Sequence, residues 1–337
     1  MKLLVTGGAG FIGSAFVRHR LDGFPDDDLV VLDKLTYAGR RENLADLPPD
    51  RLELVEGDIA DREAARRALD GCDALINFAA ESHVDRSIES PGEFITTDVF
   101  GTFVLLEAAR EQGIRHLQIS TDEVYGSIEE GTFTEASPIE PSSPYSASKA
   151  GGDLLVRAFN HTYGADALVC RASNNYGPRQ YPEKLIPLCI LNALAGDPLP
   201  VYGDGMQVRN WLHVTDFCAA ISIVLERGEA GQVYNVGGTD ELPNIEVVRR
   251  ILSLTGRDES LIEYVRDRPG HDRRYSLSAE RTTALGWRAE VAFDEGLERT
   301  VAWYRENEDW WAPIRSGEYR TYYERHYGKA LGATDVA

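Results

Sequence analysis

Short apolar runs recur along the first half of the chain, and stretches with helical spacing separate them. Runs this short and this rich in Val, Leu and Ile are typical of strands buried on both faces of a sheet. The predicted strands are residues 2–5, 29–32, 52–55, 74–78, 116–120 and 166–172. The predicted helices are residues 11–21, 62–69, 92–112 and 144–162. This alternation predicts an α/β fold with a doubly wound, parallel, Rossmann-type sheet.

The alternation loses its regularity after about residue 173. The segments 174–179 and 203–205 are rich in Asn and Gly and predict turns. A helix at 214–227 and a strand at 233–236 are expected to rejoin the first sheet. We therefore predict a Rossmann domain, a smaller C-terminal substrate-binding domain and a loosely held tail. Their residues are 1–173 with 208–237 returning to them, 174–207 with 238–325, and 326–337.

The chain carries 55 Asp and Glu against 35 Lys and Arg, which gives a formal net charge of −20. Binding nucleic acid requires a basic face, so this balance argues against a nucleic-acid partner. The four cysteines are far apart and form no C-x-x-C pair, so no metal site is expected. No apolar run reaches the length of a membrane span, and the chain opens directly on a predicted strand. We therefore expect a cytoplasmic protein with no membrane partner.

Three glycines between the first predicted strand and helix have the spacing of a dinucleotide-binding turn. Gly7, Gly10 and Gly13 permit a tight turn, close approach of a pyrophosphate and close packing of helix on strand. Asp33 ends the second strand, 20 residues after Gly13, where its carboxylate can bind the adenosine ribose hydroxyls. Because Asp33 would repel the extra phosphate of NADP, these residues favour NAD, although the basic residues that follow it leave NADP open.

Tyr145 and Lys149 are four residues apart, so they share one face of the predicted helix. An ammonium near a phenol is expected to lower the pKa of the tyrosine and make it a usable base. Such a phenolate can take a hydroxyl proton while a hydride leaves the same carbon for a nicotinamide. Thr121, Asp122 and Glu123 follow the strand at 116–120, and ligands bind at the carboxyl ends of parallel strands.

These motifs resemble the extended short-chain dehydrogenase/reductase superfamily through TGGAGFIG at 6–13, Asp33 and YSASK at 145–149. More narrowly, the chain resembles the dTDP-glucose 4,6-dehydratase family over residues 1 to about 325. The segments that carry this resemblance are STDEVYG at 120–126, AAESHVDRS at 79–87, SSPYSASK at 142–149, NNYGPRQYPEKLIP at 174–187, PVYGDG at 200–205, VRNWLHV at 208–214, DRPGHDRRY at 267–275 and Trp310-Trp311.

The resemblance implies oxidation of dTDP-glucose at carbon 4, elimination of water across carbons 5 and 6, and reduction at carbon 6, with NAD regenerated. It makes Glu123 the base at carbon 5 and Asp122 the acid at carbon 6. Tyr145 handles the hydroxyl on carbon 4, and Thr121 hydrogen-bonds the same oxygen. Two neighbouring carboxyls can divide these tasks only if their environments differ. We therefore expect burial or the adjacent Glu123 to raise the pKa of Asp122.

The resemblance also implies two sets of binding residues. The cofactor set is Gly7, Gly10, Phe11, Ile12, Gly13, Asp33, Lys34, Thr36, Asp58, Ile59, Phe78, Ala79, Ala80, Ser82, Thr97, Tyr145, Lys149 and Asn175. The sugar-nucleotide set is Ser82, Thr121, Asn174, Lys184, Leu185, Pro200, Tyr202, Arg209, Asn244, Arg268 and His271. The resemblance further implies a homodimer in which the helices near 92–112 and 144–162 of two copies pair.

Three other functions stay open at this point. A UDP-sugar 4-epimerase would share the fold and the Tyr-Lys pair, but it would leave Asp122 and Glu123 without a role. A UDP-glucose 4,6-dehydratase would differ only in the nucleobase, on which the sequence is silent. A non-catalytic, NAD-sensing regulatory protein would need the glycine turn but not the acid pair beside Tyr145.

Overall fold

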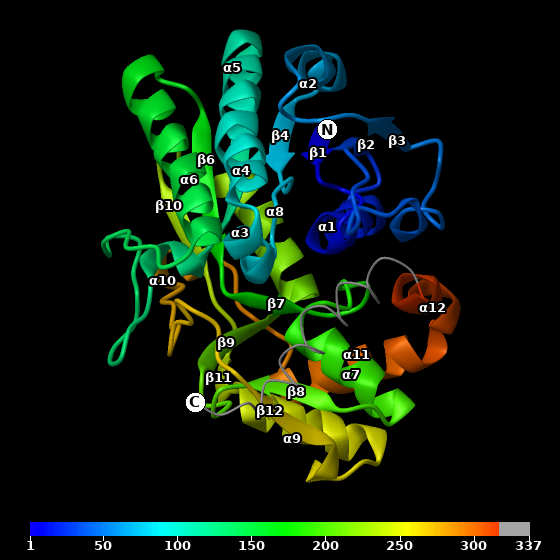
Figure 1. The fold of residues 1–337 in the computed structure, drawn as a ribbon. Helices are drawn as coiled ribbons and strands as arrows, with labels where there is room; N and C mark the ends of the chain where they lie inside the picture. Colours follow the sequence, from blue (N-terminus) through cyan, green and yellow to red (C-terminus); the bar gives the residue numbers. More distant parts are fainter. Residues whose placement is uncertain (317–337) are drawn as a thin grey trace.

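The computed structural model describes residues 1–316, so the predicted tail at 326–337 lies outside the described residues. A seven-stranded parallel sheet with the order β10-β6-β5-β4-β1-β2-β3 forms the centre of the fold (Figure 1). Its strands are β1 (Lys2–Thr6), β2 (Asp28–Asp33), β3 (Leu52–Glu56), β4 (Ala74–Asn77), β5 (Arg115–Thr121), β6 (Ala167–Ala172) and β10 (Val233–Val236). The predicted Rossmann-type sheet is confirmed.

Helices cover both faces of this sheet because successive strand residues point to opposite sides. Leu3 and Val5 of β1 pack in a core with α1 (Phe11–Gly23) and α8 (Val214–Arg227). Leu4 lies between them in sequence and packs in a core with α2 (Arg62–Leu69) and α5 (Thr102–Gln112) on the other face. Helix α6 (Pro144–Tyr163) packs beside α5 on that second face. A sheet that is covered by helices on both faces requires strands that are apolar on both sides.

Side-chain caps fix the starts of two helices. The Asp61 carboxylate accepts hydrogen bonds from the backbone N–H groups of Glu63 and Ala64, which satisfies donors that the first turn of α2 leaves free. Ser143 and Ser146 form a reciprocal capping box at the start of α6, and Pro144 occupies its first turn. The cap of α6 therefore sets the position of the turn that follows, which carries Tyr145 and Lys149.

The helix predicted at 92–112 is confirmed as a helical stretch that runs without a break from residue 91 to residue 112, but its middle is a π-helix. The structure has α3 (Val84–Glu89), α4 (Pro91–Phe94), a π-helix η2 (Ile95–Gly101) and then α5. Close packing on α6 accompanies the wide π turn, since a Cβ added at Gly152 would lie 3.0 Å from the Asp98 carbonyl oxygen. The same turn brings the Asp98 side chain into the interior, where it is 2% exposed. Isolated π turns are rare and frequently lie at functional sites.

A second, smaller assembly follows β6 in the chain. It has a three-stranded sheet of β7 (Asn174–Tyr176), β9 (Val208–His213) and β11 (Asp240–Pro243), and a two-stranded sheet of β8 (Leu199–Tyr202) and β12 (Ile262–Val265). Its helices are α7 (Leu185–Ala195), α9 (Asn244–Thr255), α11 (Phe293–Glu306) and α12 (Glu308–Ser316). This part of the chain also has the short helix α10 (Glu280–Ala284) and the 3-10 turn η4 (Glu259–Leu261), whereas the 3-10 turns η1 (Arg41–Asn43) and η3 (Asp122–Tyr125) follow β2 and β5.

The segment expected to return to the first sheet does so only in part. β10 pairs with β6 and α8 covers the sheet, as expected. Residues 208–213 instead form β9, which pairs with β7 and β11 in the smaller sheet. The expected boundary at residue 208 was wrong because β9 takes its hydrogen-bond partners from β7 and β11. The division of the chain into domains stays a prediction.

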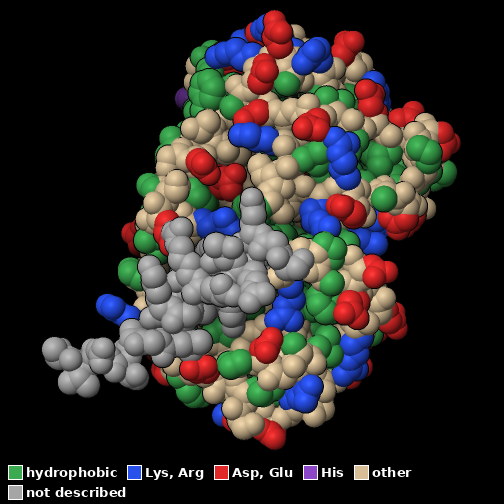
Figure 2. Space-filling model, turned by 45° about the vertical axis from the view of Figure 1, so that its right-hand side comes forward, with side chains coloured by type: hydrophobic (Ala, Val, Ile, Leu, Met, Phe, Trp, Pro, Cys, Tyr) green, Lys and Arg blue, Asp and Glu red, His purple; other side chains and the backbone are tan. Residues whose placement is uncertain are grey.

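The visible surface in Figure 2 mixes basic and acidic side chains rather than separating them. Arg66 on α2 pairs with Glu111 on α5 at 2.7 Å, and Arg62 pairs with Glu107 beside it. Exposed pairs of this kind contribute little to stability, at most about 1 kcal/mol each. Within residues 1–316, no helix has the length and apolar character needed to cross a membrane.

Candidate active site

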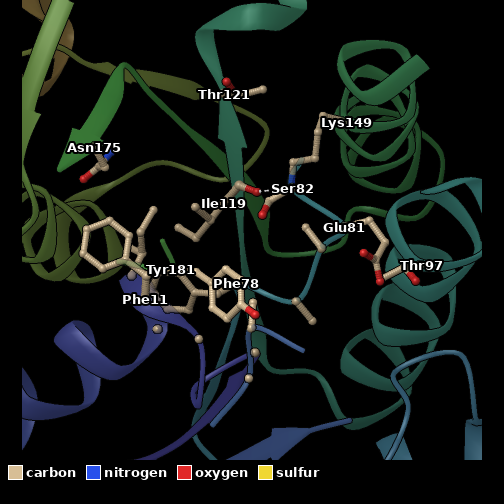
Figure 3. Close-up of a pocket in the computed structure, with 18 of the residues that line it drawn as sticks. Phe11, Phe78, Glu81, Ser82, Thr97, Ile119, Thr121, Lys149, Asn175 and Tyr181 are labelled. Atoms are coloured by element: carbon tan, nitrogen blue, oxygen red, sulfur yellow. Dashed lines mark hydrogen bonds between the residues drawn. The ribbon is translucent and has the colours of Figure 1, made fainter. Parts of the chain in front are cut away.

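A cleft opens at the carboxyl ends of β1, β4, β5 and β6, where a doubly wound sheet binds its ligands (Figure 3). All eighteen residues predicted to contact the cofactor line this cleft, from Gly7 in the turn after β1 to Asn175 in β7. The five predicted catalytic residues line it as well: Thr121, Asp122, Glu123, Tyr145 and Lys149. The fold therefore brings both sets together, while their roles stay predictions.

The glycine turn leaves no room for side chains at two of its positions. Gly7 has a φ of 65°, and a Cβ added there would lie 2.6 Å from the backbone nitrogen of Ala79. A Cβ added at Gly13 would lie 2.3 Å from the Gly7 carbonyl oxygen. These contacts are shorter than any real Cβ contact, so the turn must be glycine to pack helix α1 onto the sheet.

We expect Gly13→Ala to weaken NAD binding at least about tenfold, since the added methyl group must displace the turn that approaches the pyrophosphate. Calorimetric titration of the variant with NAD measures the effect. Gly23→Ala is the matched control, because a Cβ at Gly23 meets nothing within 4 Å. NAD affinity in the Gly13 variant equal to that of the wild type would contradict the assigned site.

Asp33 is held in one orientation at the end of β2. One carboxylate oxygen accepts a hydrogen bond from the backbone N–H of Ala9 at 2.9 Å, and the other accepts from Leu35 at 2.8 Å. Burial raises the pKa of this carboxyl, while the two backbone hydrogen bonds oppose that shift. Its neighbour Lys34 forms an exposed ion pair with Asp58 at 2.7 Å. The Lys34 charge is thus partly neutralised beside Asp33, which is consistent with the predicted preference for NAD.

The acid pair follows β5 without a gap. Thr121 is the last residue of β5, and its hydroxyl accepts from the Glu123 backbone N–H and donates to the Asp122 carboxylate, both at 3.3 Å. Asp122 is 1% exposed, and its second carboxylate oxygen is buried without a hydrogen-bond partner. The short turn η3 therefore fixes two adjacent carboxyls at the carboxyl end of β5, and Asp122 Oδ2 is left to contact a ligand.

The two carboxyls have different electrostatic environments. Burial and the adjacent Glu123 raise the pKa of Asp122 from its ordinary 3.8 to about 8. Burial also raises the pKa of Glu123, but Arg268, Arg209 and Lys184 oppose that shift. Asp122 thus keeps its proton at neutral pH, while three cations favour the ionised form of Glu123. The expected rise in the pKa of Asp122 is confirmed, and the pair has the asymmetry that a divided acid and base require.

The expected fall in the pKa of Tyr145 is wrong. Burial raises the pKa of Tyr145 well above its ordinary value, the carboxylates of Glu123 and Asp98 add to the rise, and a hydrogen bond with Thr121 opposes it. The Lys149 ammonium donates to the Ile119 carbonyl oxygen at 2.8 Å, a bond that Figure 3 shows across β5. The predicted ammonium effect is outweighed because the phenol is buried among carboxylates.

The predicted sugar-nucleotide residues divide into two groups. Ser82, Thr121, Asn174 and Lys184 line the cleft, and Lys184 donates to the Ser82 carbonyl oxygen at 2.5 Å. The other residues lie outside the cleft lining: Leu185, Pro200, Tyr202, Arg209, Asn244, Arg268 and His271. Arg209 and Arg268 still act on Glu123 electrostatically.

Some of the second group have contacts with Asp85 of α3 or within the smaller assembly. Arg268 pairs with Asp85 at 3.2 Å, the hydroxyl of Tyr202 donates to the same carboxylate, and the ring of His271 packs edge-on against Tyr202. Leu185 packs against the core of that assembly. Leu185 is thus placed by packing, and its predicted ligand contact stays a prediction.

The sequence did not identify several residues of the cleft. Those with the clearest chemistry are Ser120, Ser173, Gln180, Tyr181, Glu81 and Glu183. Ser120 is the next-to-last residue of β5 and Ser173 directly follows β6, so the rule that ligands meet strand ends could have identified both. Gln180, Tyr181 and Glu183 lie in an irregular loop, where no spacing signals a ligand contact.

The cleft contains buried polar atoms without protein partners among the described residues. They are the Ser120 and Ser173 hydroxyl oxygens, Asp122 Oδ2, the Asn174 and Asn175 amide oxygens, and Gln180 Oε1. Buried polar groups in folded proteins almost always have a partner, so this cluster indicates a polar ligand that supplies it. With the glycine turn and Asp33, these atoms fit a dinucleotide at one end and a hydroxyl-rich substrate at the other.

The fold and the site define a dinucleotide-dependent enzyme that acts on a polar substrate, and comparison with known proteins specifies it further. A family model described as GDP-mannose 4,6 dehydratase matches residues 4–300. The chain is 54% identical over 308 residues to the low-salt glycan biosynthesis protein Agl12 of Haloferax volcanii, covering 90% of this chain and 98% of that protein. It is 51% identical over 328 residues to a dTDP-glucose 4,6-dehydratase of Streptomyces niveus, with 95% and 98% covered.

A solved structure is similarly close. The crystal structure of DesIV, a dTDP-glucose 4,6-dehydratase from Streptomyces venezuelae with NAD and TYD bound, superposes with a TM-score of 0.91. It is 54% identical in sequence, and the match covers 93% of this chain and 100% of that one. The chain therefore belongs to the dTDP-glucose 4,6-dehydratase family.

Proposed function

We propose that the protein dehydrates dTDP-glucose to dTDP-4-keto-6-deoxyglucose, with NAD as a cofactor that each cycle regenerates. The observation that carries this proposal is the asymmetric acid pair. Asp122 keeps a proton at neutral pH and Glu123 faces three cations, beside a Tyr-Lys pair in a dinucleotide cleft. Reversible oxidation alone needs one base, whereas elimination of water needs a second base and an acid.

Tyr145 and Thr121 act at carbon 4 of the sugar. Tyr145 accepts the proton of the hydroxyl group in its phenolate form, which must form against the raised pKa of the phenol. Thr121 hydrogen-bonds the same oxygen. Lys149, fixed by its bond to the Ile119 carbonyl oxygen, holds the charge that favours the phenolate. When bound, NAD supplies the acceptor for the hydride that leaves carbon 4 and returns the hydride to carbon 6.

Glu123 and Asp122 then act at carbons 5 and 6. The ketone at carbon 4 makes the hydrogen on carbon 5 acidic, so the Glu123 carboxylate can remove it as a proton. The Asp122 carboxyl donates its proton to the hydroxyl on carbon 6, which leaves as water while a double bond forms between the two carbons. Glu123 returns its proton to carbon 5 when carbon 6 is reduced, so Glu123 ends the cycle unchanged.

The proton count over one cycle involves the two remaining groups. Tyr145 gains one proton at carbon 4, and Asp122 loses one to the departing water. Before the next cycle, one proton must therefore pass from Tyr145 to Asp122. The Thr121 hydroxyl donates to Asp122 at 3.3 Å and hydrogen-bonds Tyr145, so it supports a direct route for this return inside the cleft.

Incubation of the purified protein with dTDP-glucose or UDP-glucose, with NAD in catalytic amounts, tests the proposal. We expect mass spectrometry to find the loss of one water from dTDP-glucose and a slower loss from UDP-glucose. Conversion of either sugar to an isomer of unchanged mass would instead identify a 4-epimerase. No change with either sugar, despite measurable binding of NAD, would favour a non-catalytic NAD-sensing protein.

A homodimer is the proposed assembly, in the cytoplasm. Its support is an apolar surface on η2 and α6, where Ile95, Phe100, Leu154 and Tyr163 are between 44% and 58% exposed. Large exposed apolar side chains that cluster on neighbouring helices mark interaction sites. Pairing these helices across a two-fold axis would form a four-helix interface and cover all four side chains.

We expect Leu154→Glu to convert the dimer into a monomer, because a carboxylate at the centre of this surface would be buried without a partner. Sedimentation velocity at several protein concentrations measures the change. Tyr264→Glu is the matched control, since Tyr264 is 58% exposed on β12. A wild-type protein that sediments as a monomer at every concentration would contradict the proposed dimer.

A further inference from the structure

Asp98 is a buried carboxyl group that the proposed mechanism does not use. It lies in the π-helix η2 and is 2% exposed. One carboxylate oxygen accepts a hydrogen bond from the Glu81 backbone N–H at 3.0 Å, and the other accepts from the Ser148 hydroxyl at 2.5 Å. A carboxylate in an interior is costly unless its partners compensate, so its retention suggests a function.

The two partners of Asp98 belong to different walls of the active site. Glu81 is in the loop after β4, whose residues 79–82 line the cleft beside the predicted cofactor position. Ser148 is on α6, directly before Lys149, and its hydroxyl also lies 2.8 Å from the Tyr145 carbonyl oxygen. Asp98 therefore connects the cofactor wall to the turn of α6 that carries the Tyr-Lys pair.

We propose that Asp98 is a positioning residue that fixes the catalytic turn of α6 against the cofactor wall of the cleft. It acts through Ser148 and Glu81 without touching the substrate or the cofactor. The inference rests on the proposed function, which makes this turn of α6 the catalytic one. The π-helix is what places Asp98 there: the Asp98 carbonyl oxygen accepts from the Thr102 hydroxyl at 2.7 Å while the side chain points inward.

The charge of Asp98 has a second effect on the same turn. The titratable groups that face it are Lys149 and Tyr145 on α6 and Glu81 in the loop after β4. The charges of Glu93 on α4 and of Lys34 act in turn on the carboxyl of Glu81. Burial raises the pKa of Asp98 to about 6, and Lys149 opposes the rise. In its ionised form, Asp98 raises the pKa of Tyr145. Removing this charge should therefore make the phenol easier to ionise.

Asp98→Asn separates the hydrogen bonds from the charge. The amide oxygen can accept from the Glu81 N–H, and the amide NH₂ can donate to the Ser148 hydroxyl, whose own proton then goes to the Tyr145 carbonyl oxygen. Every bond is kept and the negative charge is lost. Asp98→Ala, in contrast, removes both bonds and leaves the Glu81 N–H buried without its partner.

The test compares these two variants for binding and for pH dependence. We expect Asp98→Ala to weaken NAD binding about tenfold by calorimetry and to lower kcat for dTDP-glucose by about 10- to 100-fold, as loss of a positioning contact does. Asp98→Asn should stay within about threefold of the wild type in both. Its profile of kcat/KM against pH should have its acid limb at a lower pH, because the Tyr145 phenolate persists to more acidic solution.

Ser148→Ala is a second variant that tests the proposal even if Asp98→Ala fails to fold. We expect it to lower kcat while leaving NAD affinity unchanged, since it removes only the bond to α6. NAD affinity and kcat of Asp98→Ala equal to the wild type, or an Asp98→Asn acid limb that coincides with that of the wild type, would overturn the proposal. If the wild type binds NAD but does not dehydrate dTDP-glucose, the proposed function fails, and the calorimetric comparison of the two Asp98 variants still tests the positioning role.

Discussion

Replacing Glu123 with Gln is expected to reduce the loss of water from dTDP-glucose by about 10²- to 10⁴-fold, the usual contribution of a positioned base. The amide keeps the size of the side chain but cannot take a proton from carbon 5. Oxidation at carbon 4 depends on Tyr145 and Thr121 instead, so it should remain possible. The variant should therefore bind and oxidise the sugar without completing the reaction.

Reaction in deuterated water distinguishes this block from a general loss of activity. The wild-type product should carry one solvent deuterium at carbon 5, delivered by Glu123 when carbon 6 is reduced. The Gln variant should release dehydrated product about 10²- to 10⁴-fold more slowly and leave carbon 5 of the recovered sugar unlabelled. Glu130→Gln is the matched control, because Glu130 is exposed on the loop that follows the acid pair. Normal dehydration by Glu123→Gln would contradict the role of this residue.

The residues of the site that the sequence could identify are those whose position depends on local geometry. Gly7 follows β1, Gly13 lies in the first turn of α1 and Asp33 ends β2, and the order of strands alone brings such ends to one edge. Thr121 ends β5 and the acid pair follows it directly, so a correct strand assignment places them in the cleft. The Tyr-Lys pair needed only the helical repeat of α6.

What the sequence could not supply depends on contacts between distant segments. Arg209 and Arg268 are more than 80 residues from Glu123, and only the folded loops bring their charges to it. The π turn that directs Asp98 inward has no hydrophobic signature that separates it from an ordinary helix. The raised pKa of Tyr145 could not be predicted from the sequence for the same reason. It comes from burial among carboxylates rather than from the lysine four residues away.

Replacing Asp122 is expected to have the second large effect: it should change both the rate of dehydration and the dependence of that rate on pH. Asp122 must hold a proton to release water from carbon 6, and its pKa is raised to about 8 by burial and by Glu123. Activity should therefore fall as the pH rises through about 8. Asp122→Asn cannot donate a proton, so we expect about 10²- to 10⁴-fold slower dehydration at neutral pH and no decline from this group at higher pH.

The same substitution should stabilise the fold in alkaline solution. The unfolded chain loses the Asp122 proton near its ordinary pKa of 3.8, whereas the folded protein keeps it up to about pH 8. Between these values the folded state binds more protons, so the wild type loses stability as the pH rises. The free energy of unfolding of Asp122→Asn relative to the wild type should therefore increase from about pH 4 to about pH 8 and then level off. Chemical denaturation at a series of pH values measures it, with exposed Asp22→Asn as the control. A difference that stays constant with pH would show that Asp122 ionises normally and that the acid at carbon 6 is another group.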